Sequence, residues 1–356
     1  MPTRRPAALH DALATVAPGT ALRDGLDRIV RAKMGGLVVV GDGPEVLSIC
    51  SGGFLLDAAF SPQRLSELAK MDGAMIITAD TSRIARANVH LVPNPNVPTS
   101  ETGTRHRTAE RVARSIDVPV ISVSEDMGVI AVYVGETKHV LEEIPRLLNR
   151  ANQALQTLER YKTRLDDVSN ALSALEVEDL VTTRDVASVL QRSEMVRRIA
   201  SEIDTYIVEL GVDARLIQLQ LDELMGDTED ERWSVLQDYC GCPEEADIDE
   251  ALLHLSTLDD DDLLDLPSVA RVLRLTTVAP SDGSLTPRGY RLLAKLPRLP
   301  EHVINSVVTR FGTLPKIMRA TVGDLDEVSG VDSDGARSIK DGLSRLAETS
   351  ILDRYS

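Results

Sequence analysis

The sequence predicts an α/β N-terminal domain, with a mixed β-sheet flanked by helices, followed by two regions built only from helices. Three observations indicate this. Helix-like and strand-like segments alternate up to about residue 140. A short turn at 124–128, ending in Gly, joins two strand-like runs, and so short a connection requires an antiparallel pair. From Glu142 onward, apolar residues recur at steps of three and four, which is helical spacing.

Local patterns predict the elements of the first domain, residues 1–141. Apolar residues at helical spacing favour helices over 9–16 and 22–30. A Gly pair then introduces the β-branched run 37–40, which is typical of a buried strand. Ser61, which precedes a proline, is a good N-cap for a helix ending at Lys70. Further strands are expected at 74–78, 87–92, 117–123 and 129–134.

Residues 142–283 are expected to form an all-α spacer domain, and residues 284–356 an all-α C-terminal domain. The first run of helical spacing covers about thirty residues, roughly 45 Å of helix, and a second ends at Gly211. An ordinary helical bundle with a solvated acidic face explains this pattern. A more specific interpretation is that the bundle is a spacer between two functional ends of the chain. After a linker-like cluster at 280–283, short helices are separated by Gly and Pro.

Charge is distributed unevenly along the chain, whose formal net charge is −17 over 356 residues. Residues 222–265 hold 17 acidic side chains and one Arg, whereas residues 284–323 hold seven basic side chains and one Glu. We therefore expect only the C-terminal part to meet a polyanion. No apolar run approaches the ~20 residues that span a bilayer, and the N-terminus does not resemble a signal peptide. A cytoplasmic protein with no membrane partner is expected.

Asp72 and Gly73 form the first candidate site, because they directly precede an apolar strand. A carboxylate can hold a divalent metal that bridges nucleotide phosphates, and Gly lets the backbone approach a nucleotide closely. Judged alone, an Asp-Gly pair is more often a simple turn. Both interpretations stay open at this point.

The second candidate is the cluster Arg105-His106-Arg107-Thr108, at what is expected to be the start of a helix. Cations there oppose the helix dipole, so a solvated basic turn is electrostatically odd. A bound polyphosphate would remove the penalty, since Arg side chains, hydroxyls and free N–H groups together bind anions. The sequence has no Walker A and no GxGxxG motif, so the usual nucleotide folds are not supported.

The triplets Asp72-Gly73-Ala74 and Arg105-His106-Arg107 resemble the DGA and RHR signatures of the diadenylate cyclases. Their flanks at 51–54, 68–71 and 102–111 are similar to the same domain, and the helical remainder resembles one member of that family. The resemblance implies an enzyme that condenses two ATP into cyclic di-AMP with release of two pyrophosphates, using Mg²⁺ or Mn²⁺. It also implies a homo-oligomer, an octamer in the family, in which two domains face each other.

The resemblance also implies roles for individual residues. Asp72 would bind the metal and orient the attacking hydroxyl, while Gly73 would line the nucleotide. Arg105 and Thr108 would hold phosphates, supported by His106, which could donate to phosphate or orient a neighbour. The remaining ATP-binding residues would be Leu91 near adenine and Thr104, Arg107 and Ser124 at the phosphates, with Glu125 as a second metal ligand.

The segment 325–339 looks like a helix-hairpin-helix, which aims backbone N–H groups at a DNA phosphate without reading bases. A degenerate partner lies at 296–304. Asp332 stands where a second hairpin Gly is expected, and Asp334 adds another negative charge, so a packing module that has lost DNA affinity is the alternative. The predicted DNA-binding residues are Arg298, Arg310, Lys316, Gly330, Gly335 and Arg337.

The resemblance implies a diadenylate cyclase coupled to branched DNA, as part of a DNA damage and repair response. Two alternatives remain. The chain could be a DNA-scanning binding protein with a vestigial nucleotide domain, or an active cyclase that is insensitive to DNA.

Overall fold

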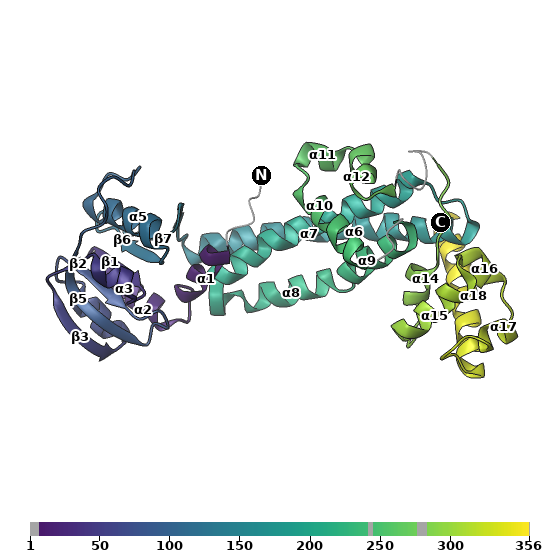
Figure 1. Cartoon of the computed structure of the whole chain (residues 1–356), viewed down its shortest axis with the longest axis horizontal. Coiled ribbons are helices and arrows are strands. Elements are labelled where there is room, and N and C mark those ends of the chain that lie inside the picture. The colour runs from purple at the N-terminus through teal and green to yellow at the C-terminus, as the bar shows by residue number, and fades with distance from the viewer. Residues whose placement is uncertain (1–6, 241–244, 276–282, 356) are drawn as a thin grey trace. The chain divides into compact units, whose positions relative to one another are not determined.

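The computed structural model describes residues 7–240, 245–275 and 283–355, and the chain divides into two compact units (Figure 1). The N-terminal unit comprises Pro2–Gln153 and Glu202–Leu219. The helical unit comprises Ala154–Ser201 and Gln220–Ser356. In the described part of the chain, no helix is both long enough and apolar enough to span a bilayer.

An eight-stranded sheet forms the centre of the N-terminal unit, in the order β2-β5-β4-β1-β6-β7-β8 with β3 also paired to β5. β1 and β4 run parallel, whereas the other pairs are antiparallel. The predicted mixed sheet is thus confirmed, and the predicted hairpin is β6–β7. The strands are β1 (Gly36–Val40), β2 (Cys50–Ser51), β3 (Phe54–Ala59), β4 (Ala74–Ile77), β5 (Arg83–Leu91), β6 (Val120–Val123), β7 (Ile130–Val134) and β8 (Thr137–Val140).

Helices cover both faces of this sheet, because successive strand residues point to opposite sides. In β1, Val38 and Val40 join an apolar core that also contains residues of α1 (Ala7–Thr15), α2 (Ala21–Arg31) and α4 (Pro62–Leu68). Leu37 and Val39 join a second core with residues of α3 (Pro44–Ser48) and α5 (Thr104–Ile116). Ser61 caps α4 as predicted, since its side chain accepts a hydrogen bond from the Arg64 N–H.

Two long helices confirm the predicted change to helical structure. They are α6 (Ile144–Glu178) and α7 (Thr183–Leu210), and α7 is followed directly by Gly211, whose φ is +53°. A Cβ at Gly211 would lie 2.4 Å from the Pro18 carbonyl oxygen, so the close approach requires glycine. The later helices are η1 (Gly211–Ala214), α8 (Arg215–Met225), α9 (Thr228–Tyr239), α10 (Glu245–Thr257), α11 (Asp260–Leu264), α12 (Leu266–Val272), α14 (Tyr290–Ala294), α15 (Glu301–Phe311), α16 (Leu314–Arg319), α17 (Val322–Asp326) and α18 (Ser333–Tyr355).

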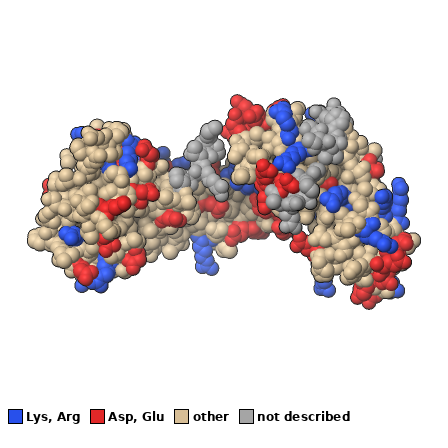
Figure 2. Space-filling view, in the orientation of Figure 1, with Lys and Arg blue, Asp and Glu red and all other residues tan. Residues whose placement is uncertain are grey.

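One of the seven basic residues at 284–323 is not available to a polyanion. Arg291 is 1% exposed and pairs with Glu176 at 2.5 Å and with Glu231 at 3.2 Å, so its charge is neutralised inside the helical unit. Six of the seven basic residues counted in the sequence are therefore left as candidates for contact with a polyanion. Over the helical unit, the face seen in Figure 2 shows Lys and Arg side chains lying among Asp and Glu side chains.

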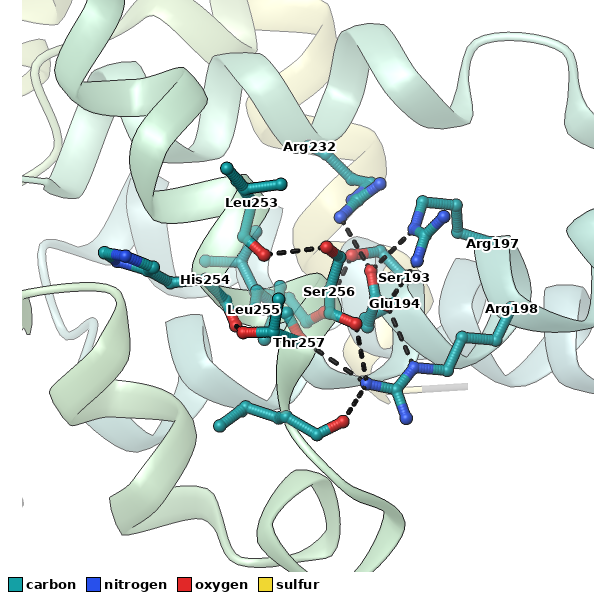
Figure 3. Close-up of polar contacts among 12 residues, drawn as sticks. Ser193, Glu194, Arg197, Arg198, Arg232, Leu253, His254, Leu255, Ser256 and Thr257 are labelled. Carbon is teal, nitrogen blue, oxygen red and sulfur yellow. Dashed lines mark hydrogen bonds and ion pairs between the residues drawn. The ribbon is translucent and has the colours of Figure 1, made fainter. Parts of the chain in front are cut away.

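A buried ionic cluster holds the middle helices of the helical unit together (Figure 3). Glu194 of α7 is fully buried and pairs with Arg197, Arg198 and Arg232 at 2.7, 3.0 and 3.0 Å. Arg198 also donates to the Leu258 carbonyl at 2.6 Å, which ties α7 to the turn after α10. Burial opposes ionisation of Glu194, but the hydrogen bonds and charges of the three guanidinium groups outweigh it and lower its pKa.

Candidate active site

A cavity of about 550 Å³ opens in the N-terminal unit, where β4, β5 and β6 meet the start of α5. It brings the two candidate segments together, although they lie about thirty residues apart in the sequence. It is lined by Leu37, Asp72, Gly73, Ala74, Val89, His90, Leu91, Gly103, Thr104, Arg105, His106, Thr108, Val123, Ser124, Glu125 and Asp126.

Arg105 connects the two predicted metal ligands across this cavity. Its guanidinium lies 3.0 Å from an Asp72 carboxylate oxygen and 3.8 Å from a Glu125 carboxylate oxygen. The Asp72 side chain is 92% exposed, so a ligand can reach it without any rearrangement of the core. The site therefore offers an open anionic oxygen donor beside a guanidinium, a group whose geometry suits phosphate.

Gly35 makes the position of Arg105 possible. A Cβ at Gly35 would lie 1.9 Å from one guanidinium nitrogen of Arg105. Because that atom is the far end of a flexible side chain, a larger residue would displace Arg105 while leaving the backbone in place. Gly35 thus provides the space in which the guanidinium reaches Asp72.

Gly73 is required for packing within the sheet. A Cβ there would lie 2.5 Å from the carbonyl carbon of Asn88 and 2.6 Å from its Cα. Asn88 itself is left-handed, with φ of +53°, at an irregularity in the β4–β5 pairing. Gly73 also lines the cavity, as predicted, so close backbone approach serves the strand pair as well as the site.

The start of α5 is held by side chains further along the same helix. Glu110 is buried and accepts hydrogen bonds from the side chain of Thr99 and from the backbone N–H of Ser100. Arg111 and Arg114 donate to the carbonyls of Val97 and Pro98, at 3.0 and 2.8 Å. The loop that leads into Arg105 is thereby pinned to the helix, which fixes where the first turn points.

One ring nitrogen of His106 contacts two buried hydroxyl groups. Its Nδ1 lies 2.6 Å from Ser122 Oγ and 3.0 Å from Tyr133 Oη. Burial lowers the pKa of His106, Glu101 opposes this effect, and Lys138 and Arg105 add to it. The ring is therefore largely neutral at pH 7.

The structure places most of the predicted site residues on the cavity wall. Arg107 is the exception: it is exposed and does not line the cavity, because it follows His106 around the helix. The prediction omitted His90 and Asp126, which flank the predicted Leu91 and Glu125, and the apolar Leu37, Val89 and Val123. Pairing of strands distant in sequence brings these residues to the cavity, and a local pattern does not reveal it.

The donor set suits a divalent cation that keeps substrate oxygens and water in its shell. Mg²⁺ is usually held by one or two carboxylates together with substrate phosphates. In the described part of the chain, no group of three acidic, His or Cys side chains is placed to hold a metal without such a substrate. Asp72 and Glu125 fit this role once a phosphate group draws the Arg105 guanidinium away from the two carboxylates.

The residues predicted to bind DNA lie in the C-terminal helices and in the turns between them, and some of them already make contacts within the chain. Arg310 pairs with Glu327 at 3.0 Å, and Arg337 lies 3.6 Å from Asp334. Lys316 and Arg298 are exposed. Gly330 has φ of +87°, and the Gly335 N–H donates to the Asp332 carboxylate at 2.7 Å.

Comparison with known proteins identifies the family. Residues 23–138 match the model described as DisA bacterial checkpoint controller nucleotide-binding, and residues 141–281 match the model for the DisA bacterial checkpoint controller linker region. The DNA integrity scanning protein DisA of Streptomyces coelicolor is 54% identical over 98% of this chain and 94% of its own length. Its counterpart in Acidothermus cellulolyticus is 55% identical over 98% and 95%, and that in Kineococcus radiotolerans is 53% identical over 100% of both chains.

The chain belongs to the DisA family of DNA integrity scanning proteins. Its N-terminal domain is accordingly a diadenylate cyclase domain, which confirms the enzyme class that the two triplets predicted. The cavity lies within the matched nucleotide-binding region.

Proposed function

We propose that the chain condenses two ATP molecules into cyclic di-3′,5′-adenylate and releases two pyrophosphates. The observation that carries this proposal is the open Asp72 carboxylate 3.0 Å from the Arg105 guanidinium, on the wall of one cavity. Each ribose 3′-hydroxyl attacks the α-phosphate of the other ATP, and pyrophosphate leaves in line. Catalysis of this kind depends mainly on positioning and on neutralising charge.

Several cavity residues have roles that suit this reaction. Arg105 and the hydroxyls of Thr104, Thr108 and Ser124 bind phosphate oxygens. Leu91 packs near the adenine, together with other apolar residues of the wall. A Mg²⁺ or Mn²⁺ ion held by Asp72 and Glu125 would neutralise the charge of the triphosphate.

The product has two-fold symmetry, so we infer that two N-terminal units face each other, each bringing one ATP. The exposed edge strand β3 supports self-association: Phe54 and Leu55 are 56% and 74% exposed, and an apolar strand of this kind favours pairing or burial. An octamer would supply four such facing pairs.

We propose further that the C-terminal helices form a helix-hairpin-helix module that binds branched DNA and couples DNA integrity to the cyclase. The hairpin between α17 and α18 contains Gly330, whose positive φ suits a tight turn. The turn before α15 contains Arg298 with φ of +63°, in a matching position between two short helices. Exposed Arg298 and Lys316 would meet phosphates and give sequence-independent binding.

A second candidate, a cyclase insensitive to DNA, is favoured by one observation. Asp332 already accepts the Gly335 N–H in the first turn of α18, at 2.7 Å. A DNA phosphate would compete for that N–H with a carboxylate of the same charge. The hairpin between α17 and α18 is therefore a poor phosphate site as long as Asp332 is present.

Incubating the protein with ATP and Mg²⁺ or Mn²⁺ tests the proposed reaction. We expect cyclic di-AMP and pyrophosphate in a ratio of one to two, at a rate that branched DNA changes more than linear duplex does. An unchanged rate with both DNAs would favour the DNA-insensitive cyclase. DNA binding without any cyclic product would favour a vestigial nucleotide domain.

A further inference from the structure

A polar chain runs from the cavity wall into the sheet behind it, and the proposed reaction leaves it without a role. It starts at His106 Nδ1, which contacts both Ser122 Oγ and Tyr133 Oη, and it ends where Tyr133 donates to a Glu101 carboxylate oxygen at 3.1 Å. Ser122 and Tyr133 lie on the neighbouring strands β6 and β7, with 0% and 1% exposure. Buried hydroxyls in such a place need hydrogen-bond partners, and this chain supplies them.

Counting donors along the chain assigns the position of the imidazole proton. Glu101 also pairs with Lys138 at 2.5 Å, so its carboxylate acts only as an acceptor. The single hydroxyl hydrogen of Tyr133 is used on Glu101, and its oxygen can then only accept. Ser122 donates its hydroxyl hydrogen to the same Tyr133 oxygen, and this hydrogen bond lowers the pKa of Tyr133, so Ser122 Oγ can only accept from His106. Hydrogen bonds from His106 to these two oxygens require the proton on Nδ1, which leaves Nε2 with a free lone pair.

The Nε2 atom of His106 is the ring nitrogen that a ligand can reach. His106 lines the cavity, and in the described part of the chain no hydrogen bond reaches Nε2. Phosphate oxygens carry no hydrogen to donate at neutral pH, whereas ribose hydroxyls do. An accepting Nε2 next to Arg105 therefore suits a ribose hydroxyl of ATP better than a phosphate.

We propose that Tyr133 is a positioning residue of the cyclase: it fixes His106 in the tautomer whose accepting Nε2 binds a ribose hydroxyl of ATP. This inference rests on the proposed function and differs from the expectation that His106 donates to phosphate. Tyr133 suits the task because its ring belongs to the core between the sheet and α5, so its hydroxyl cannot move away. Burial raises the pKa of Tyr133, with the Glu101 charge adding to the effect, so the donated proton stays in place.

A double-mutant cycle on turnover tests the proposal. Tyr133→Phe removes the hydroxyl and keeps the ring, and we expect kcat to fall about tenfold with KM for ATP nearly unchanged, as for other residues that orient a functional group. In a His106→Ala background, the same substitution should lower kcat no further, because Tyr133 acts through His106. Tyr206→Phe is the matched control: Tyr206 is 5% exposed and bonds Glu202 and Arg150, and its loss should leave kcat unchanged.

Two outcomes would overturn the proposal. One is wild-type kcat in Tyr133→Phe, and the other is an equal loss with and without His106. The ¹⁵N shifts of the His106 ring, assigned by their loss in His106→Ala, give a reading independent of turnover, and a protonated Nε2 in the wild type would also contradict the proposal. A wild-type protein with a bare Nε2 and no cyclic product would instead count against the proposed function.

Discussion

Asp72 and Arg105 form an ion pair in which the Asp72 carboxylate is exposed to solvent. An ion pair of this kind contributes little to stability, typically about 0–1 kcal/mol, because water competes for both charges. Its importance is geometric, since it holds a cation and an oxygen donor at hydrogen-bond distance before substrate arrives. Substitutions at these two residues should therefore change activity without unfolding the N-terminal unit.

Gly35 gives a test of this geometry that leaves both charges in place. Gly35→Ala puts a methyl group where the Arg105 guanidinium lies, and we expect kcat/KM for ATP to fall at least tenfold, with the thermal midpoint within about 2 °C of wild type. Gly43→Ala is the control, because a Cβ there meets nothing within 4 Å. Equal activity in the two variants would show that the position of Arg105 does not matter.

Asp72 and the Arg105 cluster could be predicted from sequence because a carboxylate before a strand and cations at a helix start are locally unusual. The same approach missed Ser122 and Tyr133, which read as ordinary residues of buried strands. Their chemistry depends on the pairing of β6 with β7 and on the loop residue Glu101, which lies some thirty positions from Tyr133 in sequence. Long-range pairing of this kind leaves no local signal.

Among the elements, α6 and α7 were predictable because their apolar residues keep helical spacing over many turns. β3 was not, because it is exposed along nearly its whole length and lacks the alternation that marks a half-buried strand. The predicted strand 117–123 begins only at Val120, since Asp117 is left-handed, with φ of +53°, at the end of α5. Buried periodicity is visible in sequence, whereas edge strands and turns depend on their partners.

The Glu194 cluster predicts how the helical unit responds to acid. Because the pKa of Glu194 is lowered in the folded state below its ordinary value of 4.5, its contribution is present above that pH and is lost as the pH falls. Relative to Glu194→Gln, the wild-type thermal midpoint should therefore drop as the pH falls below about 4.5, and the difference between the two proteins should stay constant between pH 6 and pH 7. At pH 7 the variant should be less stable by roughly 3 kcal/mol, since it leaves three guanidinium groups with one anion fewer. Parallel curves for the two proteins would contradict this account.

Across the whole chain, charge separates into an acidic middle and a more basic C-terminal segment, as the sequence indicated. The structure reduces the number of cations that are free to meet DNA, because Arg291 is buried and Arg310 pairs with Glu327. Composition alone does not show which charges are already neutralised. Affinity for DNA should therefore be modest, with a shallower dependence on salt than seven free cations would give, because that dependence scales with the number of phosphates contacted.

Asp332 determines how much of the DNA affinity comes from the hairpin between α17 and α18. Asp332→Gly frees the Gly335 N–H and removes a negative charge, so we expect DNA binding to tighten about tenfold at 0.1 M salt. Asp341→Asn, which removes one exposed negative charge from the interior of α18, is the control for charge alone. An equal gain in both variants would mean that net charge, and not the capping contact, limits binding.

The rate of cyclic di-AMP formation by Asp72→Asn tests the central claim most directly. Asn keeps the size of the side chain but loses the charge that faces the cavity and Arg105. We expect the rate to fall at least a hundredfold relative to wild type, with an unchanged thermal midpoint and with Asp11→Asn, an exposed change on α1, close to wild type. Full activity in Asp72→Asn would contradict the assignment of this cavity as the cyclase site.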